Sequence, residues 1–160
     1  MRDHLLELFD SLSTDDQAFM VRLFEAKIRS NHSPLAYIEE LMSYQFCGQE
    51  DELFIHTMEM RPEISNRYGM LHGGILSTFI DTAMGGTCFT INGTEQRTVT
   101  LDLHVRFLKE VRRGKLTCKT RVVRNGRTIT VLESHVYDEQ GHVVGSATGS
   151  FFKIPNANIE

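Results

Sequence analysis

Hydrophobic positions along the chain change their spacing near residue 50. Within residues 1–50 they recur three or four residues apart, as in the run over 19–28, which predicts an amphipathic helix. Ser13 is a typical N-cap for that helix, and Ser33-Pro34 indicates a second helix start. After residue 50 the hydrophobic positions no longer follow this pattern alone, because several stretches alternate between apolar and polar residues as strands do. We therefore divide the chain into a helical extension, residues 1–50, and a main domain, residues 51–160.

The main domain combines one long helix with several strands. Leu53–Met60 has the apolar and β-branched content of a strand, and an unbroken apolar face runs from Gly73 to about Asn92, as in a buried helix. Further strands are predicted over residues 98–107, 116–123, 127–137 and 143–152, with hairpin signals at Asn125-Gly126 and at residues 138–141. This order predicts an α+β fold in which one helix covers one face of an antiparallel sheet.

Composition and charge narrow the class of protein. Of the 160 residues, 41% are hydrophobic and 24% are charged, and the net charge is −4, as in an ordinary folded domain with no overall bias toward nucleic acid or anionic membranes. The three cysteines have no CxxC spacing, which argues against a disulfide framework or a zinc ribbon. No signal peptide and no apolar stretch of membrane-spanning length is present, so we expect a cytoplasmic protein.

The start of the long helix carries the most specific chemistry. Gly73 and Gly74 open that helix, and backbone N–H groups in a first helical turn have no partner within the helix. Glycine lets another molecule approach these donors closely, and the helix dipole adds partial positive charge. Such donors stabilise an oxyanion by about 3–4 kcal/mol. The alternative is that Gly73-Gly74 is only a tight turn.

Asp81 lies within the same, mostly apolar, helix. Ser77, Asp81 and Gly85 are four residues apart and therefore share one helix face, whose small neighbours leave room for a ligand. A buried carboxylate without a partner is costly, so Asp81 must be paired, solvated or placed at a cleft. Exposure of Asp81, or a hydrogen bond to Ser77, is the simpler structural explanation.

The segment from Asn66 to Asp81 resembles the signature of hotdog-fold acyl-CoA thioesterases of the phenylacetic-acid-degradation (PaaI) type. The shared pattern is Asn, a Gly, Leu-His-Gly-Gly at residues 71–74, and an acidic residue eight positions after Gly73. The resemblance continues in order to about residue 153. It implies a hotdog fold, an antiparallel sheet wrapped around one long helix. It also implies a homodimer or homotetramer with active sites at the dimer interface.

The resemblance further implies a catalytic role for five residues. The Gly73 N–H would polarise the thioester carbonyl of an acyl-CoA substrate. Asp81 of the other subunit would attack this carbonyl or activate water. Asn66 would place the thioester or water, His72 would orient the loop or form a hydrogen bond near the sulfur, and Thr100 would assist the water. From their positions alone, His72 could equally cap the helix, Asn66 hold a turn, and Thr100 be an ordinary strand residue.

Coenzyme A would be bound as part of the substrate, and no separate cofactor is expected. Gly74 and Ser77 are expected to contact the substrate. Residues 106–127 hold nine basic residues and one glutamate, a patch that would attract the phosphates of coenzyme A. Gly126-Arg127 matches the family's turn near the nucleotide. No histidine or cysteine spacing indicates a metal site, and Cys88, on the apolar side of the helix, is expected to be buried and inert.

Two other functions fit the same fold. One is a non-catalytic acyl-CoA sensor that joins a DNA-binding helical segment to a hotdog domain, although residues 1–50 carry a net charge of −5 and DNA-reading segments are basic. The other is a hydratase acting on enoyl-CoA. Related hydratases pair an aspartate with a histidine about five residues later, whereas Gly86 follows Asp81 at that spacing.

Overall fold

The structure, a computed structural model, describes residues 1–155, which fall into two compact units that meet between Leu41 and Met42. The sequence boundary at residue 50 lies eight or nine residues further along, because Gln45–Glu50 forms strand β1 and pairs with the next strand. A bulge between Phe46 and Gly48 interrupts the alternation that marks a strand in the sequence. The last residues of the predicted main domain, 156–160, lie outside the described part.

The first unit consists of three helices, α1 (Arg2–Asp10), α2 (Thr14–Ser30) and α3 (Tyr37–Leu41). As predicted, Ser13 caps α2, its hydroxyl oxygen accepting a hydrogen bond from the Asp16 N–H at 3.1 Å. The helix expected after Ser33-Pro34 begins only at Tyr37, because Ser33 accepts the Leu35 N–H in a local turn instead. No helix within residues 1–155 is long and apolar enough to cross a membrane.

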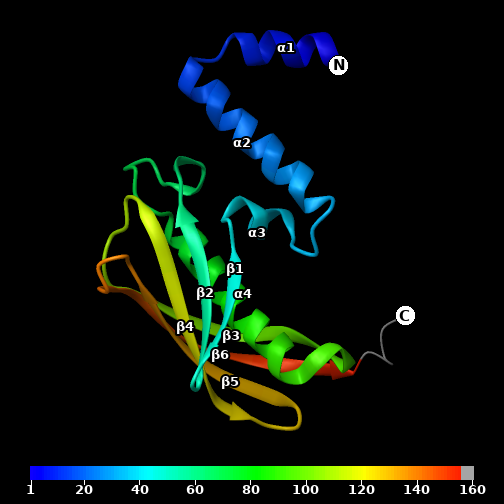
Figure 1. Cartoon of the computed structure of the whole chain (residues 1–160), viewed down its shortest axis with the longest axis vertical. Coiled ribbons are helices and arrows are strands. Elements are labelled where there is room, and N and C mark those ends of the chain that lie inside the picture. Colours follow the sequence, from blue (N-terminus) through cyan, green and yellow to red (C-terminus); the bar gives the residue numbers. More distant parts are fainter. Residues whose placement is uncertain (156–160) are drawn as a thin grey trace. The chain divides into compact units, whose positions relative to one another are not determined.

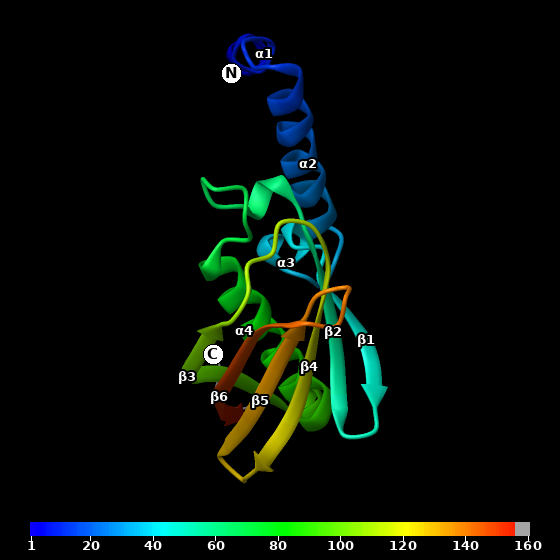
Figure 2. The same cartoon turned by 90° about the vertical axis from the view of Figure 1, so that its left-hand side faces the viewer.

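The second unit is built on one antiparallel sheet (Figure 1). The strand order is β1-β2-β4-β5-β6-β3 (Figure 2), so that β1 and β3 form the two edges. After β1, the strands are β2 (Leu53–Met60), β3 (Gln96–Phe107), β4 (Gly114–Asn125), β5 (Ile129–Tyr137) and β6 (Val143–Pro155). Short 3-10 helices cover Pro62–Ile64 and Gly93–Glu95. The predicted strands are confirmed, with ends that differ by at most three residues.

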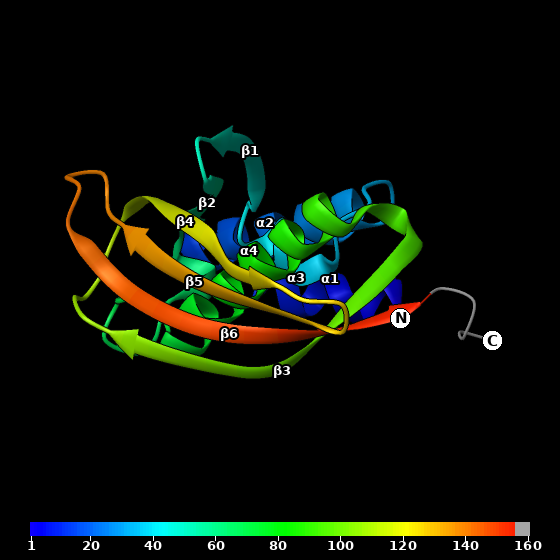
Figure 3. The same cartoon turned by 90° about the horizontal axis from the view of Figure 1, so that it is seen from below.

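Helix α4 (Gly73–Asn92) crosses the concave face of this sheet (Figure 3) and has the bounds that the sequence predicts. It buries an apolar face that includes Leu76, Phe79, Ile80, Ala83, Met84 and Cys88. Glycines on β6 permit the close approach, since a Cβ atom at Gly149 would lie 3.0 Å from the Met84 sulfur. The α+β architecture predicted from the element order is therefore confirmed.

A buried hydrogen-bond chain fastens β2 to the middle of α4. His56 on β2 is fully buried, with Nε2 3.0 Å from the Thr87 hydroxyl and Nδ1 2.8 Å from the Tyr44 hydroxyl. Thr87 donates its own hydrogen to the Ala83 carbonyl, so its oxygen must accept from His56 Nε2–H. Because burial lowers the pKa of His56 to about 4, the ring is neutral at pH 7, and it is the Nε2–H tautomer with Nδ1 accepting from Tyr44.

Candidate active site

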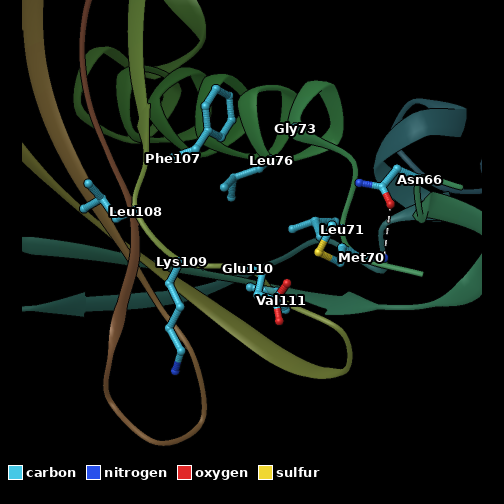
Figure 4. Close-up of a pocket in the computed structure, with 10 residues that line it drawn as sticks. All are labelled: Asn66, Met70, Leu71, Gly73, Leu76, Phe107, Leu108, Lys109, Glu110 and Val111. Carbon is cyan, nitrogen blue, oxygen red and sulfur yellow. Dashed lines mark hydrogen bonds between the residues drawn. The ribbon is translucent and has the colours of Figure 1, made fainter. Parts of the chain in front are cut away.

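The loop before α4 is held in place by Asn66. Its side-chain Oδ1 accepts the N–H groups of Tyr68 at 2.9 Å and Met70 at 3.3 Å. Gly69 adopts a positive φ of 69° within this turn, which glycine does without strain. The turn role considered for Asn66 is therefore confirmed. Because Oδ1 accepts both bonds, the amide nitrogen is left to face the cavity that Asn66 lines (Figure 4).

The first turn of α4 has one backbone donor left for a ligand among the described residues. His72 is the N-cap, and its Nδ1 accepts the Gly74 N–H at 3.0 Å, which confirms the capping alternative. The N–H groups of Ile75 and Leu76 both bond to the His72 carbonyl. No such partner takes the Gly73 N–H within residues 1–155, so Gly73 carries the free donor at the helix start.

A cavity of about 330 Å³ adjoins Gly73 (Figure 4). Its wall is mostly apolar and comes from the loop before α4, from α4 itself and from the end of β3. It is lined by Asn66, Met70, Leu71, Gly73, Leu76, Phe107, Leu108, Lys109, Glu110 and Val111. Such a cavity, apolar with a few polar groups at one end, is typical of small-molecule sites.

Asp81 lies elsewhere on α4, in a second and shallower cavity of about 250 Å³ that Ser77, Thr78, Thr100 and Leu103 also line. Its carboxylate is half-buried, and Oδ1 accepts a hydrogen bond from the Thr100 hydroxyl at 2.8 Å. Ser77, one of the two alternatives considered for Asp81, instead donates its hydroxyl hydrogen to the Gly73 carbonyl at 3.1 Å. The structure thus joins Asp81 and Thr100, which are 19 residues apart.

The remaining predicted binding residues are spread over the unit. The Gly74 N–H is engaged by His72, and Gly74 lines a separate cavity with Ile64 and Thr78. Gly126 and Arg127 lie in the β4–β5 hairpin and do not line the Gly73 cavity. The ammonium of the buried Lys153 donates a hydrogen bond to the Gly126 carbonyl at 2.8 Å and so stabilises this hairpin.

The cavity wall formed by residues 107–111 is the part of the site that the sequence did not reveal. Phe107 and Leu108 are both more than half exposed. The sequence feature that could have indicated this wall is the pair of apolar residues Phe107 and Leu108 at the end of an alternating strand. Leu108 stands where the alternation predicts a polar residue. Within the described residues, no group of three or more His, Cys, Asp or Glu side chains could hold a metal ion.

Among the cysteines, Cys88 has the buried environment that the sequence predicts. Cys88 is buried on α4, where desolvation raises the pKa of its thiol to about 11 despite the nearby Lys153 cation. Burial likewise raises the pKa of the Cys118 thiol to about 11. Cys47 on β1 is exposed. Because the thiolate is the reactive form, Cys88 is an inert packing residue.

Comparison with known proteins identifies the family. Residues 68–145 match the family model described as the thioesterase superfamily. ComA2 of Bacillus subtilis, which is named as an esterase, is 35% identical over 66% of this chain and 84% of its own length. The chain therefore belongs to the thioesterase superfamily. It spans only 65% and 61% of two proteins of Saccharolobus solfataricus that it also matches.

Two further relatives bear on the ligand and on the fold. The medium/long-chain acyl-CoA thioesterase YigI of Escherichia coli is 25% identical over 51% of this chain and 61% of its own length. A crystal structure of the BH2602 protein from Bacillus halodurans with CoA has a TM-score of 0.84 and 27% sequence identity. The superposition covers 96% of this chain and 100% of the BH2602 chain. The α+β fold described above is a hotdog fold.

Proposed function

We propose that this protein hydrolyses acyl-CoA thioesters as a PaaI-type hotdog thioesterase, with each active site assembled from two copies of the chain. The free Gly73 N–H beside an apolar cavity carries the proposal. An amide donor at a helix start stabilises the negative charge that develops on a thioester oxygen during attack. The named activity of YigI and the CoA in the BH2602 structure support an acyl-CoA as the substrate.

The spacing of Gly73 and Asp81 supports a site that is built from two copies. Their offset of eight residues corresponds to about 12 Å along a helix, and the two residues lie on different helix faces. Each residue also lines its own cavity. A single carbonyl group therefore cannot contact both residues of one chain, whereas an oxyanion donor and an attacking group must both lie within about 3 Å of the reacting atoms.

Strand β3 offers the place where a second copy would dock. It is an edge strand, and it carries both Thr100, which holds Asp81, and Phe107, which lines the Gly73 cavity. A register of antiparallel pairing in which β3 meets its copy about a two-fold axis near the middle of the strand sets the Thr100 end of one strand beside the Phe107 end of the other. That register would bring Asp81 to the Gly73 cavity of the other protomer. We propose a homodimer of this kind as the smallest active unit.

The chemistry then follows from the groups present. The Gly73 N–H polarises the carbonyl oxygen, and the Asn66 amide helps to place the thioester or a water. The Asp81 carboxylate either attacks the carbonyl carbon or takes a proton from a water that attacks it. Both routes break the carbon–sulfur bond and yield a free acid and the thiol of coenzyme A. Single-turnover hydrolysis in ¹⁸O-labelled water identifies direct attack when water opens the anhydride at its aspartyl carbonyl, because ¹⁸O then enters Asp81, whereas the general-base route places ¹⁸O only in the released acid.

The remaining predicted residues complete this model. We infer that Thr100 orients the Asp81 carboxylate, and that His72 acts by fixing the start of α4. Ser77, beside Asp81, would contact the substrate, and Gly74 would give it close access to the helix start. Gly126 and Arg127 would bind the nucleotide, whose phosphates the basic strands attract.

The test is thiol release from a panel of short, long and aromatic acyl-CoA thioesters, with wild type and Asp81→Asn. We expect release from at least one substrate by wild type and a large loss in the variant. A folded wild-type protein that releases thiol from none of them would refute the proposal. Saturable binding of an acyl-CoA without turnover would favour the sensor. A decrease in the enoyl absorbance of crotonyl-CoA would favour the hydratase.

A further inference from the structure

The wall of the Gly73 cavity is held from outside by a lysine. Lys109 lies in the segment 107–111 that lines the cavity, but its ammonium points away from the cavity (Figure 4). It reaches the β5–β6 turn, where it bonds to Asp138 Oδ2 at 2.7 Å and to His142 Nδ1 at 2.8 Å. The ammonium thus connects a loop of the cavity with a turn about 30 residues further along the chain.

The turn is built to receive this cation. Asp138 Oδ1 accepts the backbone N–H groups of Gln140 at 3.1 Å and His142 at 2.8 Å, which fixes the carboxylate. Its side chain is only 11% exposed. The Lys109 ammonium, together with the His142 N–H, holds the pKa of the Asp138 carboxyl well below its usual range. Because these backbone bonds fix the Asp138 carboxylate, this carboxylate can hold the Lys109 ammonium in one position.

The backbone repeats the same connection. The N–H groups of Leu108 and Lys109 both point to the Val144 carbonyl, at 3.0 and 3.3 Å. At the other end of the wall, the Leu71 N–H bonds to the Val111 carbonyl at 2.7 Å. Glu110 lies between these two attachments and is exposed, as is Leu108 at the first of them.

We propose that Lys109, Asp138 and His142 form a clamp that sets the width of the Gly73 cavity and thereby limits the length of the acyl chain that the enzyme accepts. These are positioning residues, since none of them touches the reacting atoms. The inference rests on the thioesterase function proposed above and adds that the cavity receives the acyl chain. Its apolar lining by Met70, Leu76 and Phe107 suits a hydrocarbon chain better than the polar amides of the pantetheine arm.

The clamp makes a specific prediction about selectivity. With the clamp intact, a chain longer than the cavity has to displace a wall that is held at both ends. Without the Lys109 cation, segment 108–110 keeps its backbone attachments but loses its outward anchor. Longer acyl chains should then be accommodated at little cost, while the Gly73 donor and Asp81 stay in place.

The experiment compares kcat and KM for saturated acyl-CoA substrates of increasing length. In wild type and in Lys27→Met, which removes an exposed lysine on α2, we expect efficiency to fall beyond one chain length. In Lys109→Met and Asp138→Asn, the ratio of efficiency on the longest chain to that on the best wild-type substrate should rise about tenfold. The change should lie mainly in KM, and Lys109→Arg should restore the wild-type profile.

The outcomes separate the two proposals. If wild type releases no thiol from any substrate, the thioesterase function fails. If it does, but the clamp variants keep the wild-type length profile, the clamp is only structural and this inference is wrong, whatever happens to their melting temperatures. The inference would also be wrong if the clamp variants changed the tolerance toward the pantetheine arm, measured with N-acetylcysteamine thioesters, and left the acyl-length profile unchanged. If Lys109→Met fails to fold, His142→Ala, which keeps the Lys109–Asp138 pair, should show a smaller shift in the same direction.

Discussion

The two ends of the proposed site, both on α4, are built in different ways. Around its first turn, the side chains of Asn66 and His72 accept hydrogen bonds from neighbouring backbone N–H groups, and these side-chain bonds span four residues or fewer. Eight residues on, Asp81 is held by the single hydroxyl of Thr100, which comes from another element. One end is a rigid local turn, and the other is a side chain positioned by tertiary structure.

The difference matches what each end has to do. An oxyanion donor must be fixed before the reaction, because its effect depends on needing no reorganisation. A carboxylate that attacks or takes a proton needs an oxygen that is not already engaged. Thr100 bonds to Oδ1 of Asp81, which orients the group and leaves Oδ2 for chemistry. Loss of activity should therefore follow changes at Asp81, while loss of helix stability should follow changes at the His72 cap.

The largest effect is expected for Asp81→Asn. The amide keeps the shape of the side chain but can neither attack nor accept a proton efficiently, so kcat should fall by about 10²–10⁴-fold. Steady-state thiol release measures this loss, and the melting temperature should stay close to that of wild type. Unchanged kcat would contradict the assignment of Asp81.

A large effect on stability is expected from His56, which contacts α4 beyond Asp81. Burial lowers the pKa of His56 from its usual 6.5 to about 4. Between these values the unfolded state binds the proton and the folded state does not. The stability contributed by the neutral ring is therefore fully present above pH 6.5. It falls by at most about 3 kcal/mol as the pH drops to about 4.

Denaturant unfolding at several pH values checks this, with His56→Gln as the matched variant. The variant should be less stable at pH 7, because the bonds to Tyr44 and Thr87 are altered, and its stability should depend less on pH between 6.5 and 4. Parallel curves for the two proteins would show that His56 is not the titrating group.

A smaller loss of activity is expected for Thr100→Val, which removes the hydroxyl bonded to Asp81 and keeps the side-chain volume. A hydrogen bond to a charged group of this kind contributes about 1.5 kcal/mol, so kcat should fall about tenfold. Thr100→Ser retains the hydroxyl and serves as the control. Equal activity of the serine and valine variants would mean that the bond does not position Asp81.

The smallest effect should come from His72→Ala, at the first turn. Removing the cap from the Gly74 N–H should cost about 1 kcal/mol of stability, or roughly 2–4 °C in melting temperature for a chain of this size. His72→Asn supplies another capping side chain and should recover most of the loss. A fall in activity as large as that of Asp81→Asn would instead give His72 a direct part in the chemistry.

The local half of the site could be predicted from sequence, and the other half could not. The glycines, the cap and the apolar face of α4 interact within a few residues, so their spacing predicts the helix and its start. The contact between Asp81 and Thr100 depends on how β3 crosses the helix, and the family resemblance suggested a role for each residue but not this contact. Lys109 and Asp138 come together only because β6 lies beside β3, which no local pattern reveals.

The same reasoning explains the differences in the fold. Strand β1 contains a bulge and a glycine and takes its conformation from pairing with β2, so its sequence gives no period of two. The helix expected after Ser33 starts later because the serine side chain closes a turn, an outcome that competes with capping on the same residues.

Subunit complementation tests most directly whether two chains build one site. Asp81→Asn disables one half, and Gly73→Val blocks the other, because a Cβ at Gly73 already lies 3.4 Å from the Phe107 ring. When the two inactive variants are unfolded together and refolded as an equal mixture, half of the dimers should hold one chain of each kind, with one intact site. The mixture should then regain about a quarter of the wild-type rate. A mixture as inactive as its separate components, although mixed dimers are present, would show that each site belongs to one chain.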